Sequence, residues 1–336
     1  MLLFAGCIFL LYVISFSKSA VMHFDKGKVL PLKSILALCI ILHHLSYRTD
    51  ILMPFRPLGA PIVALFFFIS GYGLMYNYMR KGKYYLSGFA RKRIIKALLL
   101  PFIIALFIYC ALNYQSLPSL SEAASNMIKG NPILPYSWYV YGILIIYTVF
   151  LITAKCFAKN LIVINTIFTI LFAFLLSYKG YDRCWYISLL AYPSGLLYSK
   201  YEKQIVESWN NNKVLYYSVV PFSMVLLALL VATENELAYM FAYILIPLVF
   251  VNTLSKVNIE RLGRVKIIIL ISGISYELYL SQGIAMSLLR SRYLYIDSHP
   301  LYIVITLLVT FAFAYIIRCI KIFLVRLYSF KTYFCK

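Results

Sequence analysis

Residues 29–47 read VLPLKSILALCIILHHLSY, an apolar run with a lysine, Lys33, near its start and a histidine pair, His43 and His44, near its end. The run is close to the roughly 20 residues that an α-helix needs to cross a bilayer. An ionisable group at membrane depth is costly, which makes it a candidate functional residue by default. The stretch therefore predicts a membrane span that carries membrane-embedded chemistry.

The composition of the whole chain indicates a polytopic helical membrane protein. Its 336 residues are 63% hydrophobic and only 13% charged, and the mean hydropathy is +0.84. The apolar runs are continuous, whereas a transmembrane β-barrel needs short segments of alternating polarity. We predict an all-α fold of about eleven transmembrane helices. The predicted spans lie near residues 1–17, 30–47, 57–78, 94–114, 137–155, 160–178, 184–199, 214–232, 236–254, 267–289 and 299–320.

The distribution of basic residues predicts the orientation, because cytoplasmic connections carry the excess of Lys and Arg. Eleven crossings with the N-terminus outside and the C-terminus inside (N-out, C-in) put most of the 32 Lys and Arg on the cytoplasmic side. The outer ones are Arg48, Arg56, Lys129, Lys179, Arg183, Arg290 and Arg292. This sorting explains the net charge of +21. Membrane lipid is therefore the expected partner of that charge, and no nucleic-acid partner is expected.

The chain is predicted to be one membrane domain, residues 24–330, with no appended soluble domain. The first apolar run lacks the basic segment of a signal peptide, so residues 1–23 are interpreted as an extra N-terminal transmembrane helix. Residues 331–336 are assigned to a cytoplasmic tail. The 7 Cys are scattered without C-x-x-C spacing, so neither a disulfide framework nor a metal site is expected.

Helical spacing separates the two histidines. Lys33 and His44 are 11 residues apart, close to three turns, and so share a face with about 16 Å of rise between them. His43 is rotated by about 100° from its neighbour. His44 is therefore the first candidate catalytic residue and His43 the second. The structural alternative is a histidine that only packs against a neighbouring helix.

Two further patterns lie toward the predicted cytoplasmic side. Ser70 and Gly71 interrupt the aromatic run FFFISGYG, where small residues let a ligand or another backbone come close. The connection over residues 80–96 is rich in Lys and Arg and has no acidic residue. Within it, Arg93 and Lys96 are predicted to share a helical face, which suits a phosphate-bearing ligand. A positive-inside anchor is the alternative interpretation.

Taken in order, these segments resemble the acyltransferase-3 family of integral membrane acyltransferases. The resemblance is carried by LKSILALCIILHHLS, FFFISGYGLMY, FARKRIIKALLLP, SWYVYGILIIYTVF and GISYELYLSQG, and it runs from about residue 28 to residue 320. The family modifies cell-envelope glycans and other acceptors, commonly by O-acetylation. Its ten-helix core implies that the first span is an N-terminal addition.

The resemblance implies roles for individual residues. Lys33 and His44 match the family's basic residue and the histidine eleven positions later. Arg93 and Lys96 match an Arg-x-x-Arg pattern, with a lysine that keeps the charge but loses the two-pronged guanidinium. The implied site for acyl-coenzyme A comprises Lys33, Ser70, Gly71, Arg93 and Lys96.

A late serine–tyrosine motif completes the resemblance. It is matched by Ser275, Tyr276 and Tyr279, with Gln282 where the family commonly has a histidine, a departure that removes one candidate proton carrier. Glu277 is the acidic residue predicted inside a span. It is interpreted either as a catalytic group that orients the histidine or as half of a structural ion pair.

These patterns predict an O-acyltransferase in a bacterial inner (plasma) membrane. The expected donor substrate is acyl-coenzyme A, with acetyl-coenzyme A first, and no bound cofactor is expected. A histidine would act as general base toward a hydroxyl of a carbohydrate or lipid-linked glycan acceptor, or would relay the acyl group itself. The competing class is a multi-span transporter or flippase for a polar envelope precursor. Inverted repeats would support that class, and the two halves of the sequence show none.

Overall fold

The computed structural model describes residues 6, 12–13, 20–257, 259 and 261–334, and in that part of the chain it contains no β-strand. The α-helices are α2 (Lys26–Leu45), α3 (Gly59–Lys81), α4 (Lys83–Ser87), α5 (Leu100–Leu112), α6 (Leu120–Ile128), α7 (Trp138–Cys156), α8 (Leu161–Tyr178), α9 (Ala191–Asn211), α10 (Lys213–Ala232), α11 (Glu236–Ser255), α12 (Lys266–Gly273), α13 (Ser275–Leu288) and α14 (His299–Phe334). A π-helix, η2 (Ala90–Leu99), precedes α5. The 3-10 segments are η1 (Asp50–Leu58), η3 (Tyr114–Ser116), η4 (Ala158–Asn160), η5 (Arg183–Trp185) and η6 (Leu262–Arg264).

The helices make this a multi-pass membrane protein. Within the described residues, eight helical stretches are long and apolar enough to cross a bilayer, and the pair α12–α13 adds a ninth if it counts as one span. The prediction of an all-α membrane fold is confirmed. The predicted span 267–289 is not straight, because α12 and α13 meet at an angle of 70°.

Two of the eleven predicted spans are not among these nine. The first, residues 1–17, lies almost entirely outside the described residues. The other, residues 184–199, starts at the end of η5 and continues in turns until α9 begins at Ala191, and α9 then continues through polar sequence to Asn211. The count of eleven and the N-out, C-in orientation stay predictions.

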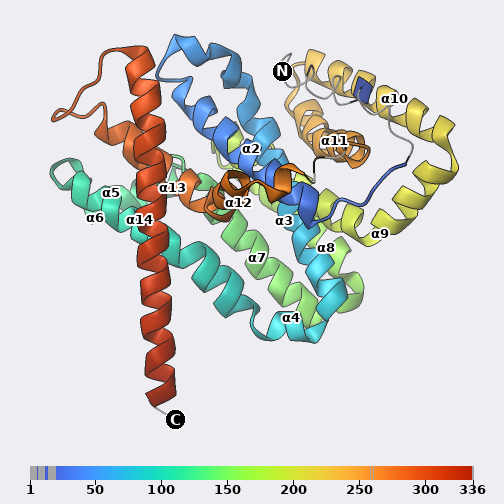
Figure 1. Ribbon diagram of the computed structural model, residues 1–336, viewed down its shortest axis with the longest axis horizontal. Coiled ribbons are helices and arrows are strands. Elements are labelled where there is room, and N and C mark those ends of the chain that lie inside the picture. The colour runs from blue at the N-terminus through green and yellow to red at the C-terminus, as the bar shows by residue number, and fades with distance from the viewer. Residues whose placement is uncertain (1–5, 7–11, 14–19, 258, 260, 335–336) are drawn as a thin grey trace.

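The helices are arranged around a central group formed by α2, α3 and α13 (Figure 1). α14 packs along α13 and α5, and its C-terminal part extends beyond the rest of the bundle. α9, α10 and α11 pack together on the opposite side, where α9 and α11 both contact α3. The central helices therefore have protein neighbours on several sides, which is where polar side chains can be held inside a membrane protein.

Among the described helices, α3 and α9 make the most extensive contact, and two glycines lie at their crossing. A Cβ atom on Gly71 would overlap the backbone carbonyl oxygen of Tyr192, and one on Gly195 would overlap that of Phe68. Helices in lipid associate through close packing and not through a hydrophobic driving force, so small residues at a crossing give the contact its strength. These two glycines fix the position of α3 in the bundle.

We expect Gly71→Ala and Gly195→Ala each to destabilise the fold, because a methyl group would push the two backbones apart. The cost should be about 1–3 kcal/mol, the usual range for overpacking. Gly73→Ala is the matched control on the same helix, since a Cβ there meets nothing within 4 Å. Thermal unfolding of the three purified variants in detergent measures the difference. Equal melting temperatures for Gly71→Ala and Gly73→Ala would contradict the assignment.

Candidate active site

A cavity of about 810 Å³ lies between α2, α3, η2, α7 and α13. These five elements are far apart in the sequence, and four of them (α2, α3, η2 and α13) bring sequence-predicted site residues to its wall. The sequence-predicted site residues that line it are Lys33, Ser70, Arg93, Ser275, Tyr276 and Tyr279. The fold thus gathers half of the twelve candidate site residues around one space.

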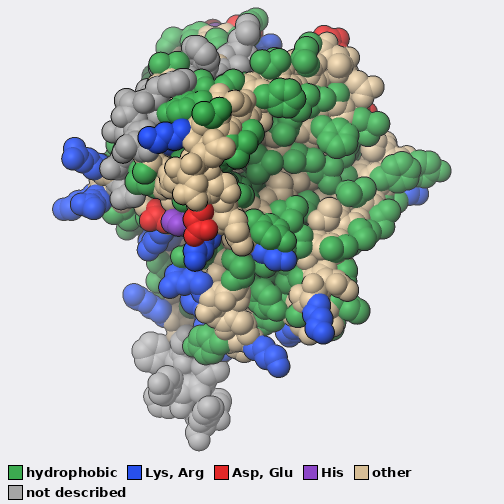
Figure 2. All heavy atoms as spheres, turned by 90° about the vertical axis from the view of Figure 1, so that its right-hand side faces the viewer, with side chains coloured by type: hydrophobic (Ala, Val, Ile, Leu, Met, Phe, Trp, Pro, Cys, Tyr) green, Lys and Arg blue, Asp and Glu red, His purple; other side chains and the backbone are tan. Residues whose placement is uncertain are grey.

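One end of the cavity, the basic mouth, is formed by exposed cationic side chains. They are Lys26, Arg80, Lys81 and Arg93. Among the described residues that line the cavity, one, Asp25, is acidic. Lys33 lies deeper, within electrostatic range of Arg93 and Glu277. On the face drawn in Figure 2, Lys and Arg side chains gather along the left side and in the lower part, and hydrophobic side chains dominate the upper and right-hand parts.

The cavity's inner end lies one helical turn short of the histidine pair. Ile40 lines the cavity, and His44 follows four residues later on the same face of α2, about 6 Å further along. On α13, Tyr279 lines the cavity and Gln282 follows about one turn later. α2 and α13 pack against each other. Two neighbouring helices therefore place His44 and Gln282 just beyond the inner end.

The ring of His44 is buried and stacked. Its centroid lies 4.0 Å from that of Tyr136, with 13° between the planes. Its Nδ1 atom has no hydrogen bond to any described residue. Tyr136 has a φ of 65°, which is uncommon without a glycine, and its carbonyl accepts a hydrogen bond from the Tyr279 hydroxyl. Tyr279 thus links the cavity wall to the residue that covers His44.

His43 has different surroundings and is used in packing. Its Nδ1 lies 3.3 Å from the carbonyl oxygen of Phe55, and its ring meets Tyr47 edge-on at 5.2 Å between centroids. A Cβ on Gly59 would overlap the His43 ring, so the start of α3 fits closely against it. Of the two adjacent histidines, His44 is the one beside the cavity with an unpaired ring nitrogen.

α-Helical spacing predicts that Arg93 and Lys96 share a face, but in the structure they do not. They lie in the π-helix η2, where hydrogen bonds run from residue i to i+5 and each turn is wider. The cavity-lining residues of this segment are Arg93, Ala97 and Leu98, spaced by four and five positions as a π-helix requires. The prediction of a shared face is therefore wrong. A role for Lys96 in donor binding stays a prediction, but its side chain is not on the cavity wall.

The small residues of α3 also divide between two faces. Ser70 and Gly73 line the cavity, and Ser70 neighbours the hydroxyl groups of Tyr139 and Tyr147. Gly71 faces α9 and is occupied by the helix crossing described above. Of the predicted pair, Ser70 can meet a ligand in the cavity directly, whereas Gly71 acts through the position of α3.

Glu277 forms an ion pair with Lys321 of α14. Its side chain is 3% exposed and that of the lysine is 23% exposed. A carboxylate buried at membrane depth needs such a partner. The pair joins α13 to α14. This contact fits the interpretation of Glu277 as half of a structural ion pair.

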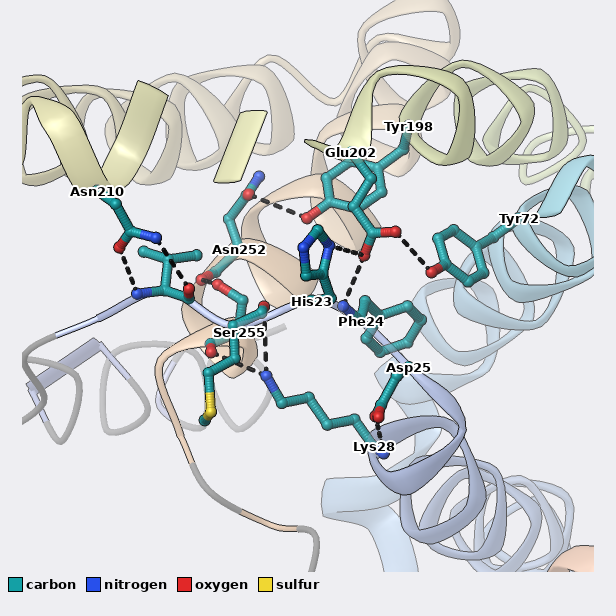
Figure 3. A network of polar contacts seen from close by, with 12 residues as sticks. His23, Phe24, Asp25, Lys28, Tyr72, Tyr198, Glu202, Asn210, Asn252 and Ser255 are labelled. Atoms are coloured by element: carbon teal, nitrogen blue, oxygen red, sulfur yellow. Dashed lines mark hydrogen bonds and ion pairs between the residues drawn. The ribbon is translucent and has the colours of Figure 1, made fainter. Parts of the chain in front are cut away.

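A buried carboxylate that the sequence did not single out, Glu202, ties the chain before α2 to α9 (Figure 3). It accepts a hydrogen bond from the backbone N–H of Phe24 at 2.6 Å and from the hydroxyl of Tyr72 at 2.8 Å. The Nδ1 atom of His23 lies 3.8 Å from the same carboxylate. Phe24 and Tyr72 both line the cavity. Glu202 therefore holds one edge of the cavity in place.

The comparison with protein families decides the class of protein. The acyltransferase-3 family model, described as an acyltransferase domain, matches residues 32–319. The chain belongs to the acyltransferase-3 family. No curated protein and no solved structure gives a significant match. With its apolar helices, this makes the protein a membrane acyltransferase, which needs an acyl donor and an acceptor.

The acyltransferase-3 match includes every candidate residue from Lys33 to Gln282, and sequence reasoning missed two others. Glu202 comes just after the predicted span 184–199, where an acidic residue carries no local sign of burial. Tyr136 lies in a loop without periodicity. Neither residue has a local signal, since the burial of one and the stacking of the other depend on distant helices.

We expect Glu202→Ala to destabilise the acyltransferase-3 protein by about 2–3 kcal/mol, the range for losing hydrogen bonds to a charged group. Glu207→Ala is the control on the same helix. Glu207 makes an exposed ion pair with Lys203 at 3.8 Å, whose loss should cost no more than about 0.5 kcal/mol. Thermal unfolding measures stability, and hydrogen exchange at Phe24 reports whether the segment has been released. Unchanged exchange at Phe24 in Glu202→Ala would contradict the assigned contact.

Proposed function

We propose that this membrane acyltransferase transfers an acyl group, acetyl in the first instance, from acyl-coenzyme A to a hydroxyl of a cell-envelope carbohydrate. The observation that carries the proposal is the cavity itself. It has a basic mouth at one end, and its inner end lies one helical turn from a buried histidine with an unpaired nitrogen. A cavity of this shape suits a ligand that is anionic at one end and reactive at the other.

The donor is proposed to enter through the basic mouth. The phosphates of coenzyme A would pair with its Lys and Arg side chains, which form strong charge-assisted hydrogen bonds to phosphate oxygens. From Lys26 at the mouth to Ile40 at the inner end, α2 rises by about 21 Å, which leaves room for the extended pantetheine arm. Lys33 and Ser70 lie along that path. The thioester would reach the inner end, beside Tyr279.

His44 is proposed as the general base. It would take the proton of the acceptor hydroxyl as the hydroxyl oxygen attacks the thioester carbonyl. A C–O bond forms, the C–S bond breaks, and the proton passes from His44 to the leaving thiolate, which gives an ester and free coenzyme A. In the relay variant the imidazole carries the acyl group before passing it to the acceptor.

The acceptor is proposed to come from the opposite side of the membrane. His44 lies near the end of α2, whereas the basic mouth lies near its start. With the predicted N-out, C-in orientation, the mouth opens to the cytoplasm, where acyl-coenzyme A is made, and His44 lies toward the outer side. A lipid-linked or polymeric glycan at a bacterial inner membrane is the acceptor class that fits this geometry.

The decisive variant is His44→Ala, for which we expect turnover to fall by about 100-fold or more, because the general base is lost. Free coenzyme A released from acetyl-coenzyme A by the detergent-purified protein, with envelope glycan present, is the measurement. His43→Gln, the neighbouring packing residue, should keep more than a tenth of wild-type turnover per folded molecule. Equal losses in the two variants would refute the choice of base. Flux of an envelope precursor across vesicles without thioester cleavage would support a transporter in its place.

The basic mouth is tested by Arg93→Gln. We expect the KM for acetyl-coenzyme A to rise about tenfold, the effect of losing one charge-assisted hydrogen bond to phosphate. The KM for acetyl-pantetheine, which has no phosphate, should change by less than twofold. Lys96→Gln, three residues away but off the cavity wall, should raise the KM for acetyl-coenzyme A less than threefold. A larger effect at Lys96 than at Arg93 would show that the donor binds elsewhere.

A further inference from the structure

Gln282 is a completely buried amide beside the candidate base. It has no solvent exposure, and neither its Oε1 nor its Nε2 has a hydrogen bond to any described residue. It lies on α13, which packs against α2, and its side chain is within interaction range of the His44 imidazole. A buried amide without a partner is costly, and most proteins avoid it. Two unpaired polar side chains side by side indicate a site that is built for an interaction.

The chemistry of the imidazole says what that interaction must be. A neutral imidazole has one N–H and one nitrogen with a lone pair, and the hydrogen bond made by the first nitrogen decides which nitrogen is left as the base. Stacking on Tyr136 holds the plane of the His44 ring. Stacking does not fix the direction in which the N–H points, because the ring can turn over within the same stack. An acceptor in the plane of the ring is needed as well.

The other groups near His44 do not supply that acceptor. His43, with its ring centroid 5.0 Å away, already lies against the Phe55 carbonyl. Glu277 is five residues before Gln282 on α13, about 140° around the helix, and it is paired with Lys321. Gln282 faces His44 and has a free carbonyl oxygen among the described contacts.

We propose that Gln282 is a positioning residue, whose amide oxygen accepts the N–H of His44 and so presents the other ring nitrogen to the acceptor hydroxyl. This inference rests on the proposed function of His44 as general base. The sequence has glutamine where the resemblance led us to expect histidine. A glutamine keeps the hydrogen bond and adds no second group that takes up protons. In this chain His44 would carry the proton, and Gln282 would only orient the His44 ring.

Three substitutions at one position separate orientation from packing. Gln282→Met keeps the length of the side chain and removes the acceptor. Gln282→Glu and Gln282→His keep an acceptor, and the glutamate places a charge in a buried site. If Gln282 orients His44, kcat should fall on the order of 10- to 100-fold in Gln282→Met, with the KM for acetyl-coenzyme A within twofold of wild type. The Glu and His variants should keep more activity than the Met variant.

The melting temperatures of the Met and Glu variants should follow the opposite order from their activities. Gln282→Met should melt at or above the wild-type temperature, and Gln282→Glu below it, since burying a charge is costly. Ser281→Ala is the matched control, because Ser281 is buried on the same helix and bonds to the Thr310 carbonyl at 3.0 Å. It should keep the activity of the wild type. A Gln282→Met variant that is as active as wild type, or a Glu variant that is less active than Met, would overturn the proposal.

A second measurement does not depend on turnover. The chain has only 4 His, so nitrogen-15 labelling of histidine gives a simple NMR spectrum, in which the His44 signals are those missing from His44→Ala. We expect one tautomer of His44 to dominate in the wild type and in Gln282→Glu, and a mixture in Gln282→Met. An unchanged tautomer in Gln282→Met would refute the positioning role. Absence of thioester cleavage by the wild type would instead refute the proposed function.

Discussion

The contact between the backbones of α3 and α9 at Gly71 and Gly195 is the constraint on which the site depends. In lipid, two helices gain little from hiding apolar side chains from each other, and close approach of their backbones is what holds them together. The same helix that is fixed by this crossing presents Ser70 and Gly73 to the cavity. One wall of the cavity is therefore positioned by an interaction on the other face of α3.

Two of the elements that line the cavity are irregular: the π-helix η2, and α13, which begins at a bend. At that bend α12 and α13 meet at 70°. Irregular backbone at membrane depth is tolerated where it is buried in protein or lines a cavity, because lipid cannot satisfy the freed N–H and C=O groups. The irregularity has a use here. It turns Arg93 toward the cavity, and it starts α13 at Ser275, so that Ser275, Tyr276 and Tyr279 face the same space.

The buried polar side chains of the described residues fall into two groups. Glu277 and Glu202 have partners, a lysine in one case and a tyrosine with a backbone N–H in the other. His44 and Gln282 contain buried polar atoms that have none. Paired groups hold helices together, since their charge is already compensated. His44 and Gln282 keep their capacity to bind a substrate or each other, and both lie just beyond the inner end of the cavity. Other buried polar atoms without a partner among the described residues, such as the hydroxyls of Ser199 and Thr306, lie outside the cavity lining.

The sequence by itself determined what depends on neighbours along the chain. Nine of the eleven long apolar runs had to be membrane helices, the 11-residue spacing had to put Lys33 and His44 on one face, and the ordered motifs carried the family resemblance. Tertiary structure decided what depends on neighbours across space. It assigned His43 to packing and left His44 unpaired, turned Gly71 to α9 and Arg93 to the cavity, and buried Glu202. The reason is physical: helical periodicity is a local property that spacing encodes, whereas the partner of a buried polar group is set by which helices meet.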